Sequence, residues 1–358
     1  MRRQWLILAA IVALSAGVTA AAVRLGGAAT PVDALHSAPR GVSLVAEFDL
    51  PVVRSASLTR AWLGPGADVG AAEVAQRCGF DPLAGVRRVV VFVAGGPDAA
   101  LERVGFVARG DLPREPLISC IDQVLADEGR SLRRLELEGV PAVAGGRGPS
   151  RAAFLGRSVI GGDEPLVVST LRVARGTEAS AAEDASLARL WSRVRWRQDA
   201  IVAMRLPEGW RPGLAAMGAD LDLGGIEALV AVAVGARVRS GLGLSVAAEW
   251  PSAAAADAFG TALRTRLAEV VQHPLARLSP WGSALAGLAV RVEGADVVVE
   301  CSLEEAQVLP LGDLVRRWLR RAPDPARPST GDDADRAPIE GETVHPGGSV
   351  HPDSTPPE

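Results

Sequence analysis

The chain has 358 residues, of which 48% are apolar, and it carries a formal net charge of −4. It contains no Lys, Asn or Tyr, so chemistry that depends on a lysine Schiff base, a phosphate-loop lysine or a tyrosine acid is excluded. The length allows one large domain or two ordinary ones, and the apolar fraction is ample for a core.

The N-terminus carries an apolar run from Trp5 to Val23, directly after Arg2 and Arg3. A run of this length can cross a bilayer core, but its small-residue end also suits a cleaved signal peptide. Residues 1–24 are therefore expected to be a signal peptide or an N-terminal membrane anchor, followed by a linker at 25–40. Because the arginines favour a cytoplasmic N-terminus, we expect the body in the periplasm or at the outer face of the inner membrane.

Four blocks of sequence recur in the same order along the chain, at offsets of 138 to 156 residues. The paired blocks are Leu44–Pro51 with Ala200–Pro207, Gly85–Gly95 with Gly225–Gly235, Val104–Pro113 with Leu242–Pro251, and Leu135–Gly145 with Val290–Glu300. One such match could arise by chance, whereas four in order indicate an internal duplication. The first unit also holds extra material at Arg147–Arg175, which we expect to form another hairpin.

Each block has a readable local structure. The first alternates apolar and polar residues, as a half-buried strand does, and the second and third are apolar runs suited to inner strands. Pro113 and Pro251 fit the first turn of a following helix. The fourth block resembles a hairpin, with Glu138–Gly139 and Glu293–Gly294 near the turns.

The order of these elements predicts an α+β fold made of two tandem related units, 41–197 and 198–321. Each unit is expected to follow the order βαββα(ββα), with a ferredoxin-like split βαβ core. That arrangement implies mostly antiparallel sheets with helices on one face.

The three cysteines are expected to divide into one bonded pair and one free thiol. Cys78 precedes the second strand and Cys120 lies in the helix after the third strand, and those strands should be antiparallel neighbours. The topology therefore brings the two cysteines to the same edge of the helix layer, in a compartment that permits disulfides. The second unit lacks both cysteines, as expected for a bonded pair. We predict a Cys78–Cys120 disulfide and a buried free thiol at Cys301.

The C-terminal residues 322–358 have few apolar residues, many Pro and Gly, and eight acidic residues against two Arg. A segment of this composition cannot build a core, so we predict a disordered acidic Pro-rich tail.

No recognisable catalytic motif is present. Asp220 and Asp222 precede Gly224 as in the opening of a calcium loop, but Ala231 stands where the closing acid is required. His273 follows a long predicted helix and is interpreted as a cation at the helix end. The sequence therefore assigns no catalytic, cofactor-binding or metal-ligating residue. It predicts no cofactor, and an acidic exported chain is not expected to bind nucleic acid.

The stretch "CGFDPL" at 78–83, the second cysteine in the following helix, the duplicated halves and the N-terminal apolar run together resemble exported proteins of unknown function from high-GC bacteria. The resemblance covers roughly residues 36–321 and its motifs are loose. It implies export and an α+β fold, and it brings no activity.

These observations lead to three hypotheses about function. The first is an exported, non-catalytic cell-envelope protein that binds or scaffolds an unknown envelope protein, held at the membrane by residues 1–24 if they are uncleaved. The second is a carrier of an apolar ligand, which requires an apolar cavity of several hundred Å³. The third is a carboxylate-based hydrolase, which requires a cleft with converging Asp, Glu or His.

Overall fold

The computed structural model describes residues 34–58, 69–95, 103–127, 129–146, 148–194, 198–221, 223–239, 241–274 and 285–308. All of them fall within one compact unit, Met1–Trp318. The predicted signal peptide or anchor at 1–24 and the predicted tail at 322–358 lie outside the described residues. None of the described helices combines the length and the apolar character needed to cross a membrane.

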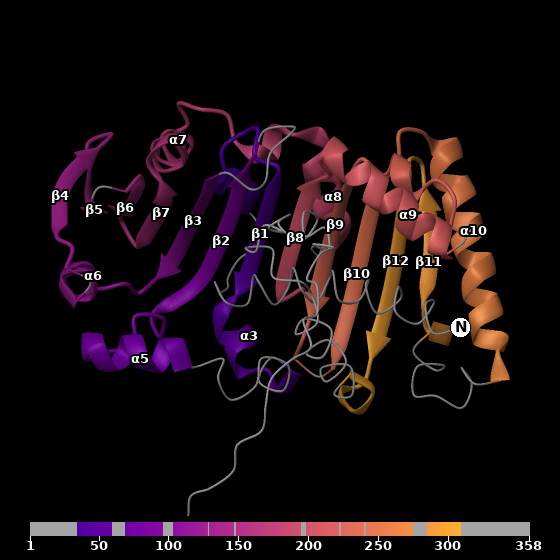
Figure 1. The fold of residues 1–358 in the computed structure, drawn as a ribbon, viewed down its shortest axis with the longest axis horizontal. Helices are drawn as coiled ribbons and strands as arrows, with labels where there is room; N and C mark the ends of the chain where they lie inside the picture. The colour runs from indigo at the N-terminus through magenta and orange to yellow at the C-terminus, as the bar shows by residue number, and fades with distance from the viewer. Residues whose placement is uncertain are drawn as a thin grey trace, which may run out of the picture. The chain divides into compact units, whose positions relative to one another are not determined.

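The described strands form one sheet of twelve strands in the order β11-β12-β10-β9-β8-β1-β2-β3-β7-β6-β5-β4 (Figure 1). The strands are β1 Leu44–Asp49, β2 Val86–Ala94, β3 Arg103–Gly110, β4 Leu132–Leu137, β5 Val140–Gly145, β6 Ser150–Leu155, β7 Ser158–Asp163, β8 Ala200–Arg205, β9 Ala231–Arg237, β10 Leu242–Glu249, β11 Ala289–Glu293 and β12 Asp296–Leu303. Every pairing between them is antiparallel. The expected α+β class with a largely antiparallel sheet is therefore confirmed.

The helices connect the strands at intervals along the sheet. They are α2 Ala34–Ser37, α3 Leu50–Ser55, α5 Val69–Cys78, α6 Arg114–Asp127, α7 Glu164–Ala174, α8 Ala185–Val194, α9 Arg211–Leu221 and α10 Ala253–Gln272, with short 3₁₀ turns η1 Ala181–Glu183, η2 Glu208–Trp210 and η3 Ile226–Ala228. The end of the predicted linker is part of the core, because Ala34 and Leu35 of α2 are buried.

The ferredoxin-like core is not confirmed. That arrangement places the first strand beside a parallel neighbour, whereas β1 has β2 on one side and β8 on the other, both antiparallel. Within the first half, β1, β2 and β3 instead form a meander of consecutive neighbours. The expected partner of β1 is replaced by β8, the first strand of the second half.

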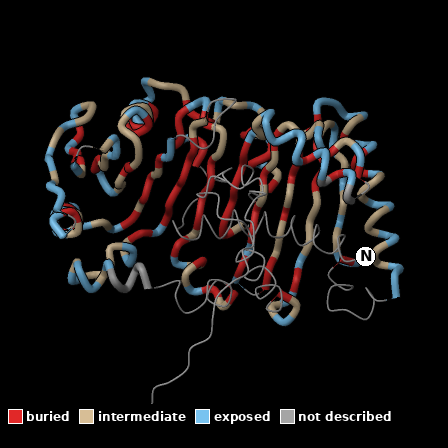
Figure 2. Tube along the Cα trace, in the orientation of Figure 1, coloured by how far each residue is buried: buried red, intermediate tan, exposed pale blue. Residues whose placement is uncertain are grey.

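The prediction of helices on one face is wrong. The apolar residues of α7 and α8 join one core cluster with Val90 and Ile201, and this face is called face A. The apolar residues of α6 and α10 join clusters with Val143 and Val297, which point to the opposite face, called face B. The cause is visible in β2, where the unbroken apolar run Val89–Val93 is buried on both sides and requires cover on both (Figure 2).

The two halves of the sheet are arranged in the same order outward from the β1–β8 pair. On one side lie β2, β3 and the hairpin β6–β7; on the other lie β9, β10 and the hairpin β11–β12. The predicted extra hairpin at Arg147–Arg175 is present as β6–β7, but it occupies the place beside β3 that matches β11–β12 beside β10. The hairpin β4–β5 instead forms the outer edge, and its turn is where the sequence placed it, with Glu138 and Gly139 both at positive φ.

Candidate functional site

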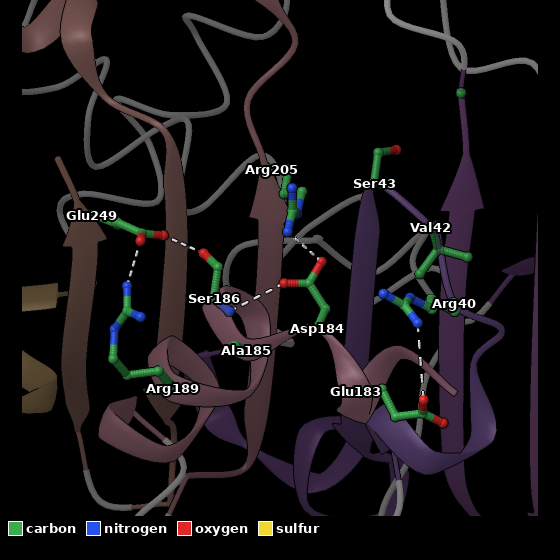
Figure 3. A pocket seen from close by; sticks show the side chains of 12 residues that line it. Arg40, Val42, Ser43, Glu183, Asp184, Ala185, Ser186, Arg189, Arg205 and Glu249 are labelled. Atoms are coloured by element: carbon green, nitrogen blue, oxygen red, sulfur yellow. Dashed lines mark hydrogen bonds and ion pairs between the residues drawn. The ribbon is translucent and has the colours of Figure 1, made fainter. Parts of the chain in front are cut away.

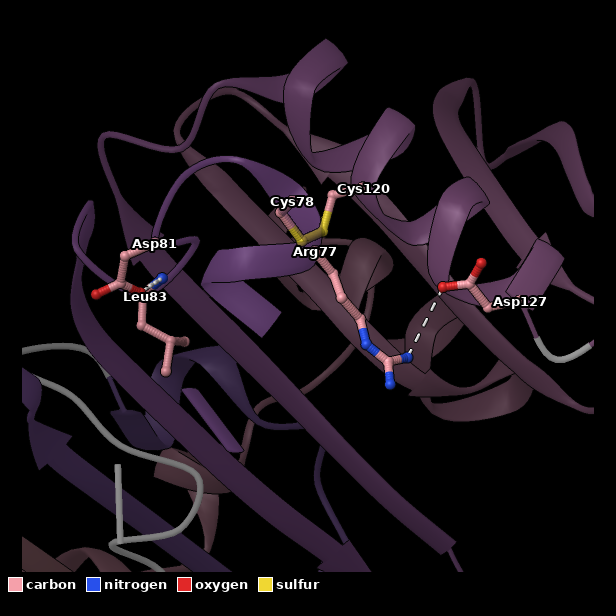
Figure 4. Close-up of a disulfide and its surroundings, with 6 residues drawn as sticks. All are labelled: Arg77, Cys78, Asp81, Leu83, Cys120 and Asp127. Atoms are coloured by element: carbon pink, nitrogen blue, oxygen red, sulfur yellow. Dashed lines mark hydrogen bonds and ion pairs between the residues drawn. A yellow bond between two sulfur atoms is a disulfide. The ribbon is translucent and has the colours of Figure 1, made fainter. Parts of the chain in front are cut away.

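The cysteine assignment from the sequence is confirmed. Cys78 at the end of α5 and Cys120 in α6 form a disulfide, with their Cα atoms 4.9 Å apart (Figure 4). The rest of the "CGFDPL" stretch also has structural roles. Gly79 adopts a φ of +71°, which favours glycine, and Asp81 accepts a hydrogen bond from Leu83 N–H at 2.8 Å and from Arg54 at 3.1 Å. The stretch therefore has a structural role: its cysteine links α5 to α6, and its glycine and aspartate stabilise the turn that follows α5.

Cys301 in β12 is a free thiol, as predicted, but it is half-buried and not fully buried as expected. Burial raises the pKa of its thiol, and a backbone hydrogen bond at Leu244 offsets only part of this effect. A thiol with a raised pKa is a weak nucleophile at neutral pH.

A cleft of about 810 Å³ lies where β1 and β8 meet, and we call it the seam cleft. It is lined by the residues that lead into β1, by the ends of β2, β8 and β10, and by the segment that joins η1 to α8 (Figure 3). The lining residues are Arg40, Gly41, Val42, Ser43, Gly95, Glu183, Asp184, Ala185, Ser186, Arg189, Arg205 and Glu249. The cleft thus brings together side chains from both halves of the chain.

Asp184 occupies the middle of the seam cleft. Burial raises the pKa of this carboxyl, but an ion pair with Arg205 at 2.6 Å and hydrogen bonds from the Leu187 and Ser186 amides outweigh burial. The net pKa of Asp184 lies below its usual range, and the carboxylate in turn raises the pKa of Arg205. Asp184 is therefore an anion held in place by a cation and by the first turn of α8.

The other two carboxylates of the seam cleft are also paired. Glu249 accepts hydrogen bonds from Ser186 and Arg189, and it raises the pKa of that arginine. Glu183 lies 4.0 Å from Arg40 across the opening, and both side chains are more than half exposed. Each acidic residue that lines the cleft therefore has an arginine partner.

A second cavity of about 230 Å³ shares Arg40, Gly41 and Val42 with the seam cleft. Arg103 and Ser169 also line it, and Ser169 donates a hydrogen bond to Glu178. Both cavities are therefore bordered by charged side chains.

A pair of carboxylates lies at the opposite end of the β1–β8 ladder. Asp199 is buried and accepts hydrogen bonds from Val238 N–H at 3.0 Å and from Arg239 at 2.8 Å. Asp49 lies 3.7 Å from the same arginine and caps α3 by accepting from Val52 N–H. Burial is the largest cause that raises the pKa of Asp49, and the nearby Asp199 adds to it. These two carboxylates hold the end of the ladder together.

The other residues considered in the sequence analysis as ion-binding or charged candidates do not form a site in the described part of the chain. His273 follows α10 and its N–H donates to the Val270 carbonyl, in agreement with a helix-end position. Asp222 lies outside the described residues. Within the part of the chain that the structure describes, no group of three or more His, Cys, Asp or Glu side chains could hold a metal ion.

Sequence reasoning missed the seam cleft. Its residues carry no motif, and the pair Arg40–Glu183 joins two positions that only the tertiary fold brings together. The one available signal was the capping box formed by Ser180 and Glu183, which is present in the structure and marks the start of the acidic segment at 183–184.

Comparisons with known proteins give little further information. No protein-family model and no curated protein matches the chain. Among solved structures, crystal form I of TP0453 is similar with a TM-score of 0.40 and 10% identity, over 80% of this chain and 98% of that one. Crystal form III of TP0453 gives a TM-score of 0.42 and 9% identity, over 78% and 98% of the two chains.

Proposed function

We propose that this chain is an exported, non-catalytic protein of the cell envelope that acts by binding or scaffolding, and that its partner docks at the seam cleft. The observation that carries the proposal is the pairing of every carboxylate in the cleft with an arginine. Paired charges around an open cleft can recognise a polar segment of a partner protein, since electrostatic complementarity gives orientation and specificity.

The same pairing argues against hydrolysis. A carboxylate hydrolase needs one carboxyl that is protonated near neutral pH, with its pKa raised by its surroundings. The pKa of Asp184 is shifted in the opposite direction. Asp49, whose pKa is raised, lies at the far end of the β1–β8 ladder, where it caps a helix.

Export is supported by two independent features. The disulfide between Cys78 and Cys120 is the kind of bond that persists in oxidising compartments. The apolar run Trp5–Val23 behind two arginines has the composition of an export signal or anchor. A location in the periplasm or at the outer face of the inner membrane accounts for both.

We also propose that the two halves, 41–197 and 198–321, derive from one duplicated unit. In the sequence, Leu44–Pro51 matches Ala200–Pro207 at an offset of 200 − 44 = 156. In the β1–β8 ladder, Ala46 pairs with Val202, and 202 − 46 is also 156. Ala46 therefore pairs with the residue that holds the matching position in the other block. This register is the one expected when a local two-fold axis relates the two strands.

The backbone hydrogen bonds at the ends of this ladder support the same relation. Asp49 N–H donates to the Asp199 carbonyl at 2.7 Å, and Arg205 N–H donates to the Ser43 carbonyl at 2.8 Å. The donors differ by 205 − 49 = 156 and the acceptors by 199 − 43 = 156. A two-fold rotation that superposes one half on the other would therefore map each of these two hydrogen bonds onto the other.

The binding proposal is tested by capture from envelope extracts, followed by mass spectrometry, with two matched variants. Arg40→Glu reverses an exposed charge at the cleft, where loss of the ion pair should cost at most about 1 kcal/mol of stability. Arg157→Glu reverses an equally exposed charge in the β6–β7 turn. We expect Arg40→Glu to reduce the captured partner at least about tenfold, with Arg157→Glu close to wild type. If the wild type and both variants capture equal amounts of the partner, the seam cleft is not the docking site.

A further inference from the structure

One edge of the sheet is formed by β4, which has a neighbour on one side only among the described strands (Figure 1). That neighbour is β5, and the ladder runs from the pair Leu132–Gly145 to the pair Leu137–Val140. An edge strand presents a row of backbone N–H and C=O groups that can accept a further strand. No residue of β4 lines either of the two cavities described above. A strand added to β4 would therefore use a surface that is separate from the seam cleft.

The β4–β5 turn fixes which residues present their backbone groups to this outer edge. A loop of two residues, both at positive φ, separates the strands, so the closing pair Leu137–Val140 is a hydrogen-bonded one. Hydrogen-bonded and non-bonded pairs alternate along an antiparallel ladder. The N–H and C=O groups of Arg134 and Glu136 therefore point away from β5, toward the outer edge.

The side chains of β4 divide into an apolar and a charged side. Leu135 and Leu137 are half-buried and pack against the cluster on face A. Arg134 lies opposite Val143 of the face B cluster, so Arg134 and Glu136 are on face B, where both are exposed. Among the described residues, Glu136 has no hydrogen-bonding or ion-pair partner for its side chain.

The charges of β4 decide how two copies of this strand can pair. An antiparallel pair of identical edge strands is related by a two-fold axis perpendicular to the sheet, so one residue lies opposite its own copy. If that residue is Arg133, Arg134 or Glu136, like charges lie directly opposite each other, which is destabilising. If it is Leu135, Arg134 of each copy lies opposite Glu136 of the other, and the two copies of Leu135 meet.

We propose that β4 is a self-association surface, on which a second copy of this chain adds its own β4 in the antiparallel register centred on Leu135. Arg134 of one copy and Glu136 of the other then form a hydrogen-bonded pair, because the backbone groups of both point outward. Each of the two such pairs exchanges two backbone hydrogen bonds. On face B, the two side chains of each pair form an ion pair across the strands. The sheets of the two copies thus continue into one another across a closed two-fold interface.

The charges also favour a second copy over other strands. Charged side chains on an edge strand normally discourage the addition of a strand. A strand that pairs with β4 has to place an acid opposite Arg134 and a base opposite Glu136, and β4 itself carries this pattern. The strand at the other end of the sheet, β11, differs in this respect, because its Arg291 binds Glu293 and Glu300 of its own chain. Charge complementarity therefore favours the pairing of β4 with β4.

Single cysteines test the register in the full chain, which carries Cys301→Ala and keeps its disulfide. Leu135→Cys lies on the axis, in a non-bonded pair whose Cα atoms are about 4.5 Å apart, within the reach of a disulfide. Arg133→Cys of one copy lies opposite Leu137→Cys of the other. Each of these two cysteines is about 14 Å from its own counterpart along the strands, which is too far for a bond.

On mild oxidation we expect Leu135→Cys to form a disulfide-linked dimer. Arg133→Cys and Leu137→Cys should each crosslink with themselves at least about tenfold more slowly, whereas a mixture of the two should crosslink readily. The mixture keeps the test decisive if the half-buried position 135 does not tolerate cysteine. No linked dimer from Leu135→Cys or from the mixture would overturn the proposal. A mixture that crosslinks no faster than its components would overturn the register.

Charge reversals test the choice of partner in chains without added cysteines. Glu136→Arg places arginines opposite each other, and Arg134→Glu places acids opposite each other. In sedimentation experiments over a dilution series, each variant alone should associate at least about tenfold more weakly than the wild type. An equimolar mixture of the two variants should recover the association of the wild type, because unlike charges are again opposite. Arg157→Glu, a similarly exposed reversal in the β6–β7 turn, should change nothing.

Three results would contradict the pairing of β4 with β4. The first is a wild-type chain that stays monomeric throughout the dilution series. The second is a mixture that associates no better than its two components. The third is growth beyond a dimer, which would show that β4 pairs with a different edge, since a two-fold contact closes at two copies.

Discussion

Ala46 lies directly opposite Val202 in the ladder that joins the two halves of the sheet. The two residues also hold matching positions in the paired sequence blocks that begin at Leu44 and Ala200. The halves are thus joined through the strands that carry the first pair of matched blocks, and the sheet continues across the join without a free edge. The seam cleft lies at one end of this ladder, so its shape depends on both halves keeping their relative positions.

The helix α8 is the second connection between the halves. It belongs to the first half in sequence, but its Arg189 and Arg193 bind Asp296 of β12 at 3.1 and 2.9 Å. Asp296 is 1% exposed. Because the arginines are partly exposed, Asp296→Ala should cost about 2–3 kcal/mol, less than for a fully buried pair.

Chemical denaturation measures this cost, and Glu300→Ala is the control. Glu300 pairs with Arg291 at 2.9 Å, but both side chains are about half exposed, so its loss should cost under about 1 kcal/mol. Similar costs for the two variants would show that α8 is not anchored through Asp296.

The disulfide should stabilise the α5–α6 corner as a single unit. Cys78 and Cys120 are 42 residues apart, and closing a loop of that length contributes about 3–4 kcal/mol in the chain-entropy model. Cys78→Ala and Cys120→Ala should each lose that stability, and the double variant should lose little more than either. Additive losses, or free alkylation of all three cysteines after denaturation without reductant, would contradict the pairing.

Asp49 should make stability depend on pH. Its pKa is raised in the folded state, so the folded chain favours the protonated form. Its favourable contribution is complete below the ordinary value of 3.8 and is lost as the pH rises through the folded-state pKa. Asp49→Asn, which is always neutral and keeps an oxygen for Val52 N–H, should therefore gain stability relative to wild type near neutral pH.

Urea unfolding as a function of pH checks this expectation. The advantage of Asp49→Asn should shrink as the pH falls from neutral through the folded-state pKa of Asp49 towards 3.8, and should not change further below that value. Asp49→Ala is the control, since it also removes the charge but loses the helix cap at a cost of about 1 kcal/mol. An advantage of Asp49→Asn that does not change with pH would contradict the assignment.

The tail at 322–358 should be dispensable for folding. Its composition gives it nothing to bury, so truncation after Arg321 should leave the melting temperature nearly unchanged. A fall of many degrees in calorimetry would show that the tail docks on the body.

Strands, turns and the cysteine pair were predictable from the sequence because their signals are local or follow from one neighbour relation. The apolar stretch Leu44–Asp49 and the glycine at 139 indicate β1 and the β4–β5 turn, although β1 is buried on both faces and not on one face as its period of two predicted. The disulfide followed from the single correct inference that β2 and β3 are antiparallel neighbours. Such signals do not depend on the global arrangement.

The global arrangement was less predictable. The run Val89–Val93 shows that a strand is buried on both faces, but it does not say which helices cover it. The neighbours of β1 depend on β8, which lies more than 150 residues away in the sequence. The seam cleft was missed for the same reason, because Asp184 and Arg205 form a site only after both halves have joined.

The most direct test of the binding proposal places a photo-crosslinking residue at Arg40, at the seam cleft, in cells that make the full-length protein. The control carries the same residue at Arg157, in the β6–β7 turn. The account predicts one discrete crosslinked species from position 40 in the envelope fraction, absent from position 157, and no turnover of that partner on purification with the protein. No crosslink at position 40, the same species from both positions, or cleavage of the partner by the purified protein would contradict it.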